Sequence, residues 1–311
     1  MKKSVVTVVL MFIFCISFFS GCILDDWKET GTPPAPASTE TAAASGKTPN
    51  PQEDVSVKPG LSGELTVSFL DVGQGDSAFL ELPDGKTMLI DAGPSDAGDK
   101  IVSFIQKKGY RKIDYLIATH PHADHIGGMK KVLKNFKIGE IYMPKASTNT
   151  KTYEKLLEEI SDQGLKIKTA KAGLSLCDGI ELLAPNGGGY EDLNNYSVVL
   201  RIINGQNRFL FMGDAEILSE TEILDAGFDV RADVIKVGHH GSGTSSGNEF
   251  VSAVQANYAV FSVGDDNSYN HPHIFVVEKW KKAGAQTCRT DEMGTITFRS
   301  DGTAIEMTSE K

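Results

Sequence analysis

The sequence predicts an α/β domain in four layers, with two β-sheets packed face to face and helices on both outer sides. Strand-like apolar runs alternate with amphipathic runs of helical period through residues 64–308. The second half of this region repeats the style of the first, so the chain holds two similar sets of mixed strands and helices. Such sets bury their apolar faces when the sheets pack together and helices cover the outside, in an α/β/β/α order.

Strands of the first half are predicted where apolar residues alternate or run together between turn signals. They cover residues 64–71, 77–82, 86–91, 113–120 and 137–143, and the turn at 83–85 joins the second to the third. Helices are predicted where apolar residues recur at intervals of three and four. They cover residues 96–109, 127–137 and 150–164.

The second half gives the same alternation, again with turn residues between the elements. Its predicted strands cover residues 180–185, 197–203, 208–214, 232–240, 257–264, 295–299 and 304–307. Its predicted helices cover residues 215–227 and 274–284. The sequence has no internal repeat of fixed period and no sign of a second domain, so a single folded domain is expected over residues 61–311.

Residues 1–21 are predicted to be a lipoprotein signal peptide. Lys2 and Lys3 form a short positive region, and the apolar run at 5–19 is too short for a standard membrane-spanning helix. Small residues precede Cys22, as in a bacterial lipobox, so Cys22 is the expected lipid attachment site. The alternatives are a plain secretory signal or an uncleaved anchor. The lipoprotein interpretation makes this an extracytoplasmic protein held at the membrane by its lipid.

Residues 22–60 are predicted to be a disordered tether, because they are rich in Pro, Ala, Ser and Thr and almost free of large apolar residues. The net charge of −10 becomes −12 when Lys2 and Lys3 leave with the signal. This charge disfavours broad attachment to nucleic acid or anionic lipid but allows a local basic patch. Cys177 and Cys288 have no CxxC spacing; they form either one disulfide or two free thiols.

The segment HPHADH is the strongest chemical signal in the chain. It places His120, His122, Asp124 and His125 at the end of a predicted strand and in the tight loop that follows. His120 and His122 can face one metal ion, and Asp124 and His125 a second. Nitrogen and oxygen ligands of this kind suit Zn, Mn or Fe. The alternative is a solvated histidine-rich loop.

Two more strands end in residues that can bind metal. Asp214 follows the strand at 208–214, where a carboxylate could bridge two ions; the alternative is a turn or a helix cap. His239 and His240 end the strand at 232–240. Glycines and hydroxyl residues follow them, which allows close approach of an anion. The three strand ends together indicate a metal centre.

Six separated motifs carry a family resemblance. They are, in order, FLDVGQGDSAFLELPDGKTMLIDAG, THPHADHIGG, NNYSVVLRI, FMGDAE, IKVGHHGSGTSS and YNHPH. They resemble the metallo-β-lactamase-fold domain of competence proteins of the ComEC type, over nearly all of residues 64–308. The resemblance implies the metallo-β-lactamase fold and a metal-dependent hydrolase. The transmembrane channel portion of those proteins has no match here, so the hydrolase module alone, on a lipoprotein stalk, is expected.

The resemblance also implies roles for single residues. His120, His122, Asp124 and His125 match the metal-binding motif, and Asp214 matches the bridging aspartate. His240 matches the late histidine ligand, with His239 as the alternative. Asp91 matches a buried aspartate that supports the metal loop. The loop DVGQGD contributes three residues that line or brace the site, unless it is simply a glycine-supported turn: Asp71, Gln74 and Asp76.

One departure from the family pattern affects the first metal site. Many relatives have another histidine ligand before the bridging aspartate, whereas residues 126–213 contain no histidine. Asn194 or Asn195 lies where that ligand is expected, and asparagine is a weaker, neutral ligand. The first site is therefore weaker or completed by water, unless His271 or His273 reaches the centre; binding substrate or bracing a loop is the other role for these two. The expected cofactor is one or two divalent ions, Zn or Mn.

The leading functional prediction is a metal-dependent phosphodiesterase, a nuclease acting on DNA outside the cytoplasmic membrane. A metal-bound hydroxide would be the nucleophile, oriented by Asp124 or Asp214. Charge on the phosphoryl group would be stabilised by residues within the two late motifs: Ser242, Thr244 and His271. A lysine cluster after the metal loop favours DNA, unless it is only a solvated helix face: Lys130, Lys131, Lys134 and Lys137.

Two other functions stay open at this stage. Secreted phosphodiesterases of the same superfamily, including those that remove phosphorylcholine from cell-wall polymers, resemble the chain in the same way. A phosphocholine esterase, or a hydrolase of another ester or of β-lactams, is therefore one alternative. A non-catalytic DNA-binding lipoprotein that supports competence is the other, which the intact set of candidate ligands disfavours. No protein partner is indicated.

Overall fold

The structure of the chain is a computed structural model that describes residues 60–311. The predictions for residues 1–21 and for the tether, including lipid attachment at Cys22, lie outside the described residues, apart from Gly60 at the end of the tether. Within residues 60–311, no helix has the length and apolar character needed to cross a membrane. Cys177 and Cys288 are both free thiols, which decides between the two alternatives for this pair.

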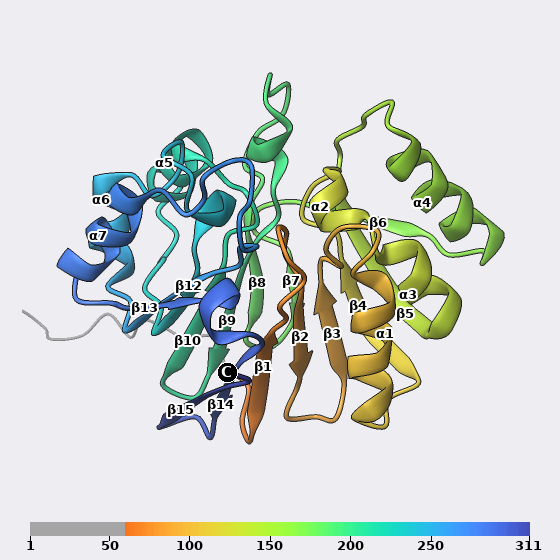
Figure 1. Cartoon of the computed structure of the whole chain (residues 1–311), viewed down its shortest axis with the longest axis horizontal. Coiled ribbons are helices and arrows are strands. Elements are labelled where there is room, and N and C mark those ends of the chain that lie inside the picture. The colour runs from red at the N-terminus through yellow and green to blue at the C-terminus, as the bar shows by residue number, and fades with distance from the viewer. Residues whose placement is uncertain (1–59) are drawn as a thin grey trace, which may run out of the picture. The chain divides into compact units, whose positions relative to one another are not determined.

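The first sheet has eight strands in the order β15-β14-β1-β2-β3-β4-β5-β6 (Figure 1). The strands from β3 to β6 are parallel, and the remaining neighbours are antiparallel. Their bounds are β1 (Leu65–Phe69), β2 (Ala78–Glu81), β3 (Thr87–Ile90), β4 (Lys112–Ile117), β5 (Lys137–Pro144), β6 (Ile167–Ala170), β14 (Ile296–Ser300) and β15 (Ile305–Ser309).

The second sheet has seven strands in the order β13-β12-β11-β10-β9-β8-β7. The strands from β10 to β13 are parallel, and the pairs from β10 to β7 are antiparallel. Their bounds are β7 (Ser175–Cys177), β8 (Ile180–Ala184), β9 (Val199–Asn204), β10 (Asn207–Phe211), β11 (Val234–Lys236), β12 (Tyr258–Phe261) and β13 (Gln286–Arg289).

An apolar core joins the two sheets. Phe69 of the first sheet stacks on Phe211 of the second with ring centroids 5.6 Å apart, and it meets the edge of Phe298 at 5.9 Å. All three rings are buried, together with aliphatic residues from both inner faces. Burial of inner faces of this size is the main stabilising contribution to a two-sheet fold.

Helices cover the outer face of each sheet. The helices α1 (Gly98–Lys107), α3 (Met129–Asn135) and α4 (Lys151–Asp162) pack on the first sheet, and α5 (Ile217–Asp225), α6 (Asn248–Val254) and α7 (Ile274–Lys282) on the second (Figure 1). Short turns complete the domain: α2 (Ala123–Ile126), α8 (Thr290–Met293) and the 3₁₀ turns η1 (Leu193–Tyr196) and η2 (Gly238–Gly241). The four-layer α/β/β/α prediction is confirmed.

Three strands that deliver candidate ligands end earlier than predicted. β4 ends at Ile117 rather than residue 120, β10 at Phe211 rather than residue 214, and β11 at Lys236 rather than residue 240. The residues that follow each strand leave the ladder and form the loops that carry the candidate ligands, where their side chains make contacts of their own. The loops after β3, β4, β10 and β11 leave from the carboxyl ends of parallel strands, which is where open α/β sheets form their sites.

Candidate metal centre

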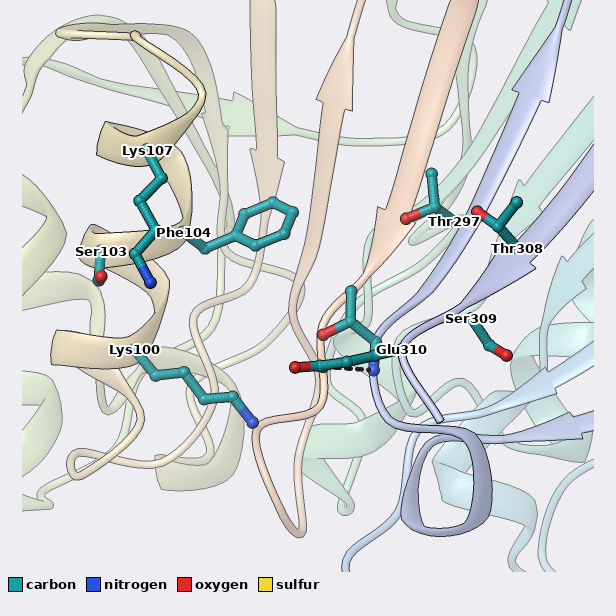
Figure 2. A pocket seen from close by; sticks show the side chains of 9 residues that line it. Lys100, Ser103, Phe104, Lys107, Thr297, Thr308, Ser309 and Glu310 are labelled. Atoms are coloured by element: carbon teal, nitrogen blue, oxygen red, sulfur yellow. Dashed lines mark hydrogen bonds between the residues drawn. The ribbon is translucent and has the colours of Figure 1, made fainter.

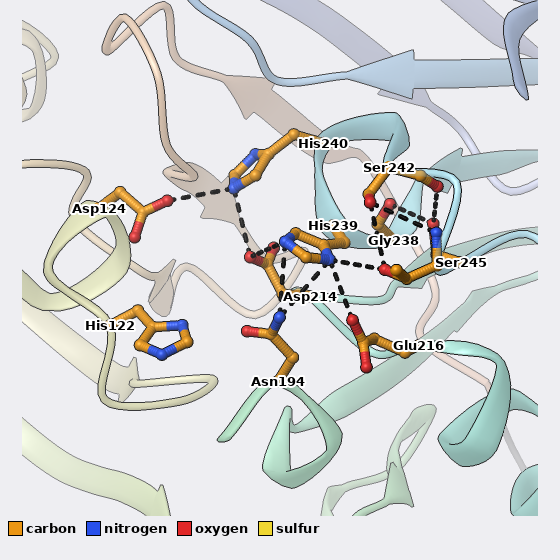
Figure 3. Close-up of polar contacts among 12 residues, drawn as sticks. His122, Asp124, Asn194, Asp214, Glu216, Gly238, His239, His240, Ser242 and Ser245 are labelled. Carbon is orange, nitrogen blue, oxygen red and sulfur yellow. Dashed lines mark hydrogen bonds and ion pairs between the residues drawn. The ribbon is translucent and has the colours of Figure 1, made fainter. Parts of the chain in front are cut away.

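Four side chains from three separate loops meet at one point. Asp124 and His125 lie in α2, Asp214 follows β10, and His240 lies in η2; their ligand atoms all lie within 4.8 Å of one another. Oδ2 of Asp214 is 3.2 Å from Nε2 of His125 and 3.3 Å from Nε2 of His240. Oδ2 of Asp124 is 3.3 Å from the same nitrogen of His240 (Figure 3).

These residues fit a divalent cation. Nε2 of His125, Nε2 of His240 and Oδ1 of Asp214 are buried without a hydrogen-bond partner. Burying such atoms without partners costs free energy, and a cation bound among them would satisfy all three. Imidazole nitrogens with carboxylate oxygens form the donor set of Zn and Mn sites. Asp124, His125, Asp214 and His240 are therefore candidate ligands of one ion.

His120 and His122 lie on another side of Asp214. Nε2 of His120 is 2.9 Å from Nδ1 of His122 and 3.8 Å from Oδ2 of Asp214. His120 and His122 lie outside the group of ligand atoms that meet within 4.8 Å, so a second ion site at these two histidines stays a prediction. Asp214 is near both groups, and its bridging role also stays a prediction.

The two asparagines that take the place of the missing histidine have different surroundings. Nδ2 of Asn194 is 3.4 Å from Nε2 of His239, and its Oδ1 is buried without a partner. Nδ2 of Asn195 instead donates to Glu216 at 3.1 Å. Figure 3 shows the Asn194 amide beside Asp214 and His239. Of the two alternatives, Asn194 is the one that faces the centre.

A strained turn separates the two late histidines. His239 and His240 have φ of 47° and 53°, a left-handed conformation that is uncommon outside glycine. The turn sends His240 toward Asp124 and His125, whereas His239 faces Asn194, with its Nε2 3.9 Å from Asp214. His240 is therefore the stronger candidate ligand, and His239 lies beside Asn194 and Glu216.

Buried hydrogen bonds fix the direction of the imidazoles. Nδ1 of His125 lies 2.8 Å from Asp91, which also accepts from the backbone N–H and the hydroxyl of Thr119. Nδ1 of His240 lies 2.9 Å from the carbonyl oxygen of Ser262. In both rings Nδ1 is held by a hydrogen bond, so that Nε2 is directed toward the other candidate ligands. This contact agrees with the predicted supporting role of Asp91.

The loop DVGQGD divides between two positions. Asp76 lies beneath the centre, with Oδ1 3.2 Å from Nδ1 of His240. Asp71 pairs with Lys100 at 3.4 Å, and Gln74 accepts from the backbone of Gly264. Asp71 and Gln74 therefore brace the loop and lie outside the ligand group. Gly75 is required there, because a Cβ would lie 2.3 Å from the carbonyl oxygen of Asp124.

Lys236 is a site residue that the sequence did not reveal. Its Nζ is 2.6 Å from Asp76 and donates to the carbonyl oxygens of Gly213 and Val237. Both charged side chains are buried. A buried ion pair whose other hydrogen bonds are also satisfied favours one arrangement of the two segments that carry it. Here it joins the loop after β1 to the end of β11 and holds the backbone just before Asp214.

The electrostatic field of the centre couples the titration of its residues. Burial would lower the pKa of His125 and His240, but the carboxylates around them, Asp214 foremost, hold both pKa values well above the ordinary range. The same histidines hold the pKa of Asp214 well below its usual range against the effect of burial. Burial and the neighbouring His125 lower the pKa of His120. Without a cation, the centre is an array of buried opposite charges.

The remaining predicted residues lie near His239 or near its neighbour His271. The hydroxyl of Thr244 lies 3.0 Å from Nδ1 of His239 and 3.1 Å from the hydroxyl of Ser242. The ring of His271 lies 5.5 Å from that of His239, and its Nδ1 is buried without a partner. Burial and the nearby histidines lower the pKa of His271 to about 4, so its imidazole is neutral at pH 7. His273 accepts from the backbone of Gly243 and braces the loop.

Glu220 is a second residue without a sequence signal, since it sits in α5 among ordinary charged residues. Its buried carboxylate accepts the backbone N–H groups of Ser246 and Gly247 at 2.6 and 2.7 Å. These contacts hold the loop that follows the histidine pair. Burial raises the pKa of Glu220 to about 7.

Replacing Glu220 with alanine is expected to lower the free energy of unfolding by about 1–3 kcal/mol, because two backbone donors lose their acceptor. The folded pKa of Glu220 lies above the ordinary glutamate value, so its contribution to stability is present at low pH and declines as pH rises toward 7. Urea denaturation at pH 5 and pH 8 measures both effects, with Asp225→Ala on the same helix as the control. If the free energy of unfolding of Glu220→Gln changed between pH 5 and pH 8 as much as that of the wild type, the pH dependence could not be assigned to Glu220.

A groove that we call the lysine groove borders the metal loop. It has a volume of about 330 Å³ and is lined by Ser95, Ile126, Gly127, Lys130, Lys131, Lys134, Thr152, Lys155 and Leu156. Three of the four predicted lysines line it, Lys155 joins them from α4, and Lys137 lies outside it. Glu159 lies 3.7 to 3.9 Å from two of these lysines and offsets part of their charge. The groove begins at Ile126, next to the candidate ligand His125.

A separate pocket of about 400 Å³ lies between α1 and the strands β14 and β15 (Figure 2). Lys100, Ser103, Phe104 and Lys107 line it from the helix, and Thr297, Thr308, Ser309 and Glu310 from the other side. Its lining includes none of the candidate ligands. We therefore treat it as a feature apart from the metal centre.

Comparison with known families agrees with this geometry. Residues 70–265 match the family model described as the metallo-beta-lactamase superfamily. The chain belongs to the metallo-β-lactamase superfamily. Divalent metal binding, by one or two ions, and a hydrolase fold follow as the superfamily's common features, and the candidate ligands are consistent with both.

Curated relatives place the chain in the ComEC/Rec2-type branch of this superfamily, as the resemblance implied. ComE operon protein 3 of Bacillus subtilis (strain 168) is 34% identical over 263 residues, covering 78% of this chain and 34% of that protein. Recombination protein 2 of Haemophilus influenzae is 30% identical over 256 residues, covering 79% of this chain and 30% of that protein. The chain thus spans about a third of the length of these relatives.

A solved structure shares the metallo-β-lactamase fold at low sequence identity. CmlA, a diiron β-hydroxylase from Streptomyces venezuelae, matches with a TM-score of 0.50 and 17% identity, over 73% of this chain and 53% of that one. At this identity the likeness supports the fold alone.

Proposed function

We propose that this metallo-β-lactamase-superfamily hydrolase is a phosphodiesterase that cleaves DNA outside the cytoplasmic membrane. One observation carries the proposal: Asp124, His125, Asp214 and His240 converge, and Nε2 of both histidines and Oδ1 of Asp214 are buried without a hydrogen-bond partner. The site outside the membrane rests on the predicted lipoprotein signal and on relatives named as competence and recombination proteins.

The residues of the chain have separate tasks in this proposal. Divalent cations, when bound, would supply Lewis acidity for activating water and for polarising a phosphoryl oxygen. Asp214 holds the histidines of both groups around one carboxylate, and Asp124 contributes from the edge of the opening. Because Asp91 and the carbonyl of Ser262 hold the Nδ1 atoms of two rings, the ligand atoms are arranged before substrate arrives.

Neutral donors lie beside His239, close to where a phosphodiester would bind. Ser242 and Thr244 carry hydroxyls beside His239, and His271 has an uncharged imidazole that can donate one N–H. Donors fixed in advance stabilise negative charge that develops on phosphoryl oxygens during hydrolysis. We assign this role to the three residues.

The lysine groove favours a polyanionic substrate. Its four lysines gather on one side of the metal loop in a chain whose net charge is −10, so the attraction is local. A DNA backbone that leaves the metal centre along this groove would contact lysine side chains at successive phosphates. A small choline ester or a β-lactam has no row of phosphates for these lysines to bind.

The double variant His122→Ala, Asp124→Ala is expected to lose phosphodiester hydrolysis by at least about 100-fold, because one candidate ligand is removed from each group. The test compares plasmid DNA, bis(p-nitrophenyl) phosphate, p-nitrophenyl phosphorylcholine and nitrocefin, with Mn or Zn added. Cleavage of the first two by the wild type, lost in the double variant and kept in Asp225→Ala, supports the proposal.

Three other outcomes would overturn it. Equal activity in the double variant would remove the metal centre from catalysis. Preference for p-nitrophenyl phosphorylcholine or nitrocefin would assign the site to a different ester or to β-lactams. Tight DNA binding without metal and without cleavage would favour a non-catalytic binding protein.

A further inference from the structure

A row of four rings leads from the metal centre to the surface. We call it the aromatic ladder; it consists of Tyr269, His271 and His273, which precede α7, and Phe275 in the first turn of α7. Tyr269 stacks on His271 with centroids 5.7 Å apart and planes 22° from parallel. Phe275 stacks on His273 at 5.5 Å and 17°. The two histidines meet edge to face at 5.1 Å.

His271, a middle ring of the ladder, lies next to the late histidine pair. The ring of His271 is stacked toward that of His240, with centroids 6.3 Å apart, and meets the edge of His239 at 5.5 Å. His271 is only 9% exposed. One buried ring therefore separates Tyr269 from the metal centre, a step that a neighbouring nucleotide can span.

The outer rings are open to solvent. Tyr269 is 61% exposed and Phe275 is 56% exposed, although both have large apolar surfaces. Each stacks on a histidine and still has more than half of its surface open to solvent. Exposed aromatic residues next to the metal centre indicate a surface that binds a ligand or a partner.

The chain holds these rings in place before any ligand arrives. The side chain of Asn267 accepts the backbone N–H of His271 and donates to its carbonyl oxygen. Gly243 donates to Nδ1 of His273, and a Cβ at Gly243 would lie 2.6 Å from the ring of Phe275. A side chain at Gly243 would therefore force the ring of Phe275 to move. The ladder is thus a fixed surface, and fixed surfaces lose little entropy on binding.

We infer that Tyr269 and Phe275 stack on unpaired bases of the DNA strand beside the phosphodiester to be cleaved, so that the preferred substrate is single-stranded. The free faces are flat π surfaces, which suit a planar base of any sequence. Bases within a duplex stack on one another and present only their edges, so they cannot use these faces. This inference rests on the proposed function for the identity of the substrate.

The test measures binding of a fluorescein-labelled oligothymidylate by anisotropy in EDTA, where no strand is cleaved. Tyr269→Ala and Phe275→Ala are each expected to weaken binding about tenfold, the usual loss for one base-stacking ring. Tyr269→Phe keeps the ring and should bind like the wild type. Ile274→Ala, which removes an exposed apolar side chain from the same segment, is the matched control.

Two further probes separate stacking from other contacts. A strand of the same length with abasic positions should bind the wild type and both alanine variants alike. A strand that carries 2-aminopurine should lose fluorescence on binding the wild type and keep it with the double alanine variant. Melting temperatures of all variants show whether the fold is retained.

Several results would overturn the inference. They are equal binding of abasic and normal strands, full-strength binding by the double alanine variant, and duplex DNA bound as tightly as the single strand. Ring-dependent binding to phosphatidylglycerol vesicles without ring-dependent DNA binding would assign the ladder to a membrane surface. Because binding is measured without turnover, a loss of stacking is distinguishable from a failure of the proposed hydrolysis.

Discussion

Replacing Asp214 with asparagine is expected to lower phosphodiester hydrolysis by at least about 10³-fold, the largest effect of any single substitution in this chain. One carboxylate oxygen of Asp214 lies within 4 Å of ring nitrogens of four histidines: His120, His125, His239 and His240. Asparagine has nearly the same shape but no charge, and its amide nitrogen repels a cation. The change therefore removes the group common to both sets of candidate ligands.

The measurement pairs hydrolysis of bis(p-nitrophenyl) phosphate with the metal content of the protein after gel filtration. We expect Asp214→Asn to lose bound metal together with activity, and Asp225→Asn, a surface change on α5, to keep both. A variant that keeps its metal and at least a tenth of its activity would show that Asp214 is not a ligand. Loss of activity with full metal content would make it a positioning residue instead.

The fold was predictable because apolar runs mark the strands that the two sheets bury. The strands that the sequence did not reveal are β6, β7 and β13, which lie at sheet edges. β6 is exposed at three of its four positions, so it has no apolar pattern to detect. The ends of β4, β10 and β11 were placed too late, because the residues after a strand continue its run in the sequence and leave it in the structure.

The candidate site was predictable to the extent that its residues are close in sequence or end a strand. His120 to His125 lie in one loop, and strand ends pointed to Asp214 and His240. A contact between two residues that are far apart in the sequence cannot be predicted in this way. Lys236 lies inside the predicted strand at 232–240 with no signal of its own, and only the fold shows that it meets Asp76 at 2.6 Å.

Alternatives between neighbours also needed the fold. Asn194 and Asn195 are adjacent and chemically identical, so only the direction of η1 separates the one beside His239 from the one that binds Glu216. The same holds for Asp71 and Asp76, which the resemblance treated alike. One pairs with Lys100 at the rim and the other lies beneath His240.

Adding Mn²⁺ or Zn²⁺ to the metal-free protein is expected to raise its melting temperature by several degrees. A ligand that binds only the folded state stabilises it by about 2.7 kcal/mol at 100 times its Kd. That stabilisation corresponds to a shift of several degrees for a domain of this size. Differential scanning fluorimetry measures it, and EDTA should reverse it. Asp214→Asn should show little or no shift, whereas Asp225→Asn should behave like the wild type.

The same titration should release protons and become tighter as pH rises. The pKa values of His125 and His240 are raised in the metal-free protein because Asp214 and its neighbours favour their charged forms. A cation can bind their nitrogens only after the protons leave, so affinity increases with pH until both pKa values are passed.

The stability of the metal-free protein depends on pH in the opposite direction. The ion pairs of His125 and His240 with Asp214 stabilise the fold at low pH, and that contribution is lost as pH rises through the raised pKa values of the two histidines. Calorimetry in two buffers of different ionisation enthalpy counts the protons. If the heat of metal binding does not depend on the buffer, no protons are released. Both histidines would then already be neutral in the metal-free protein, which would contradict the raised pKa values.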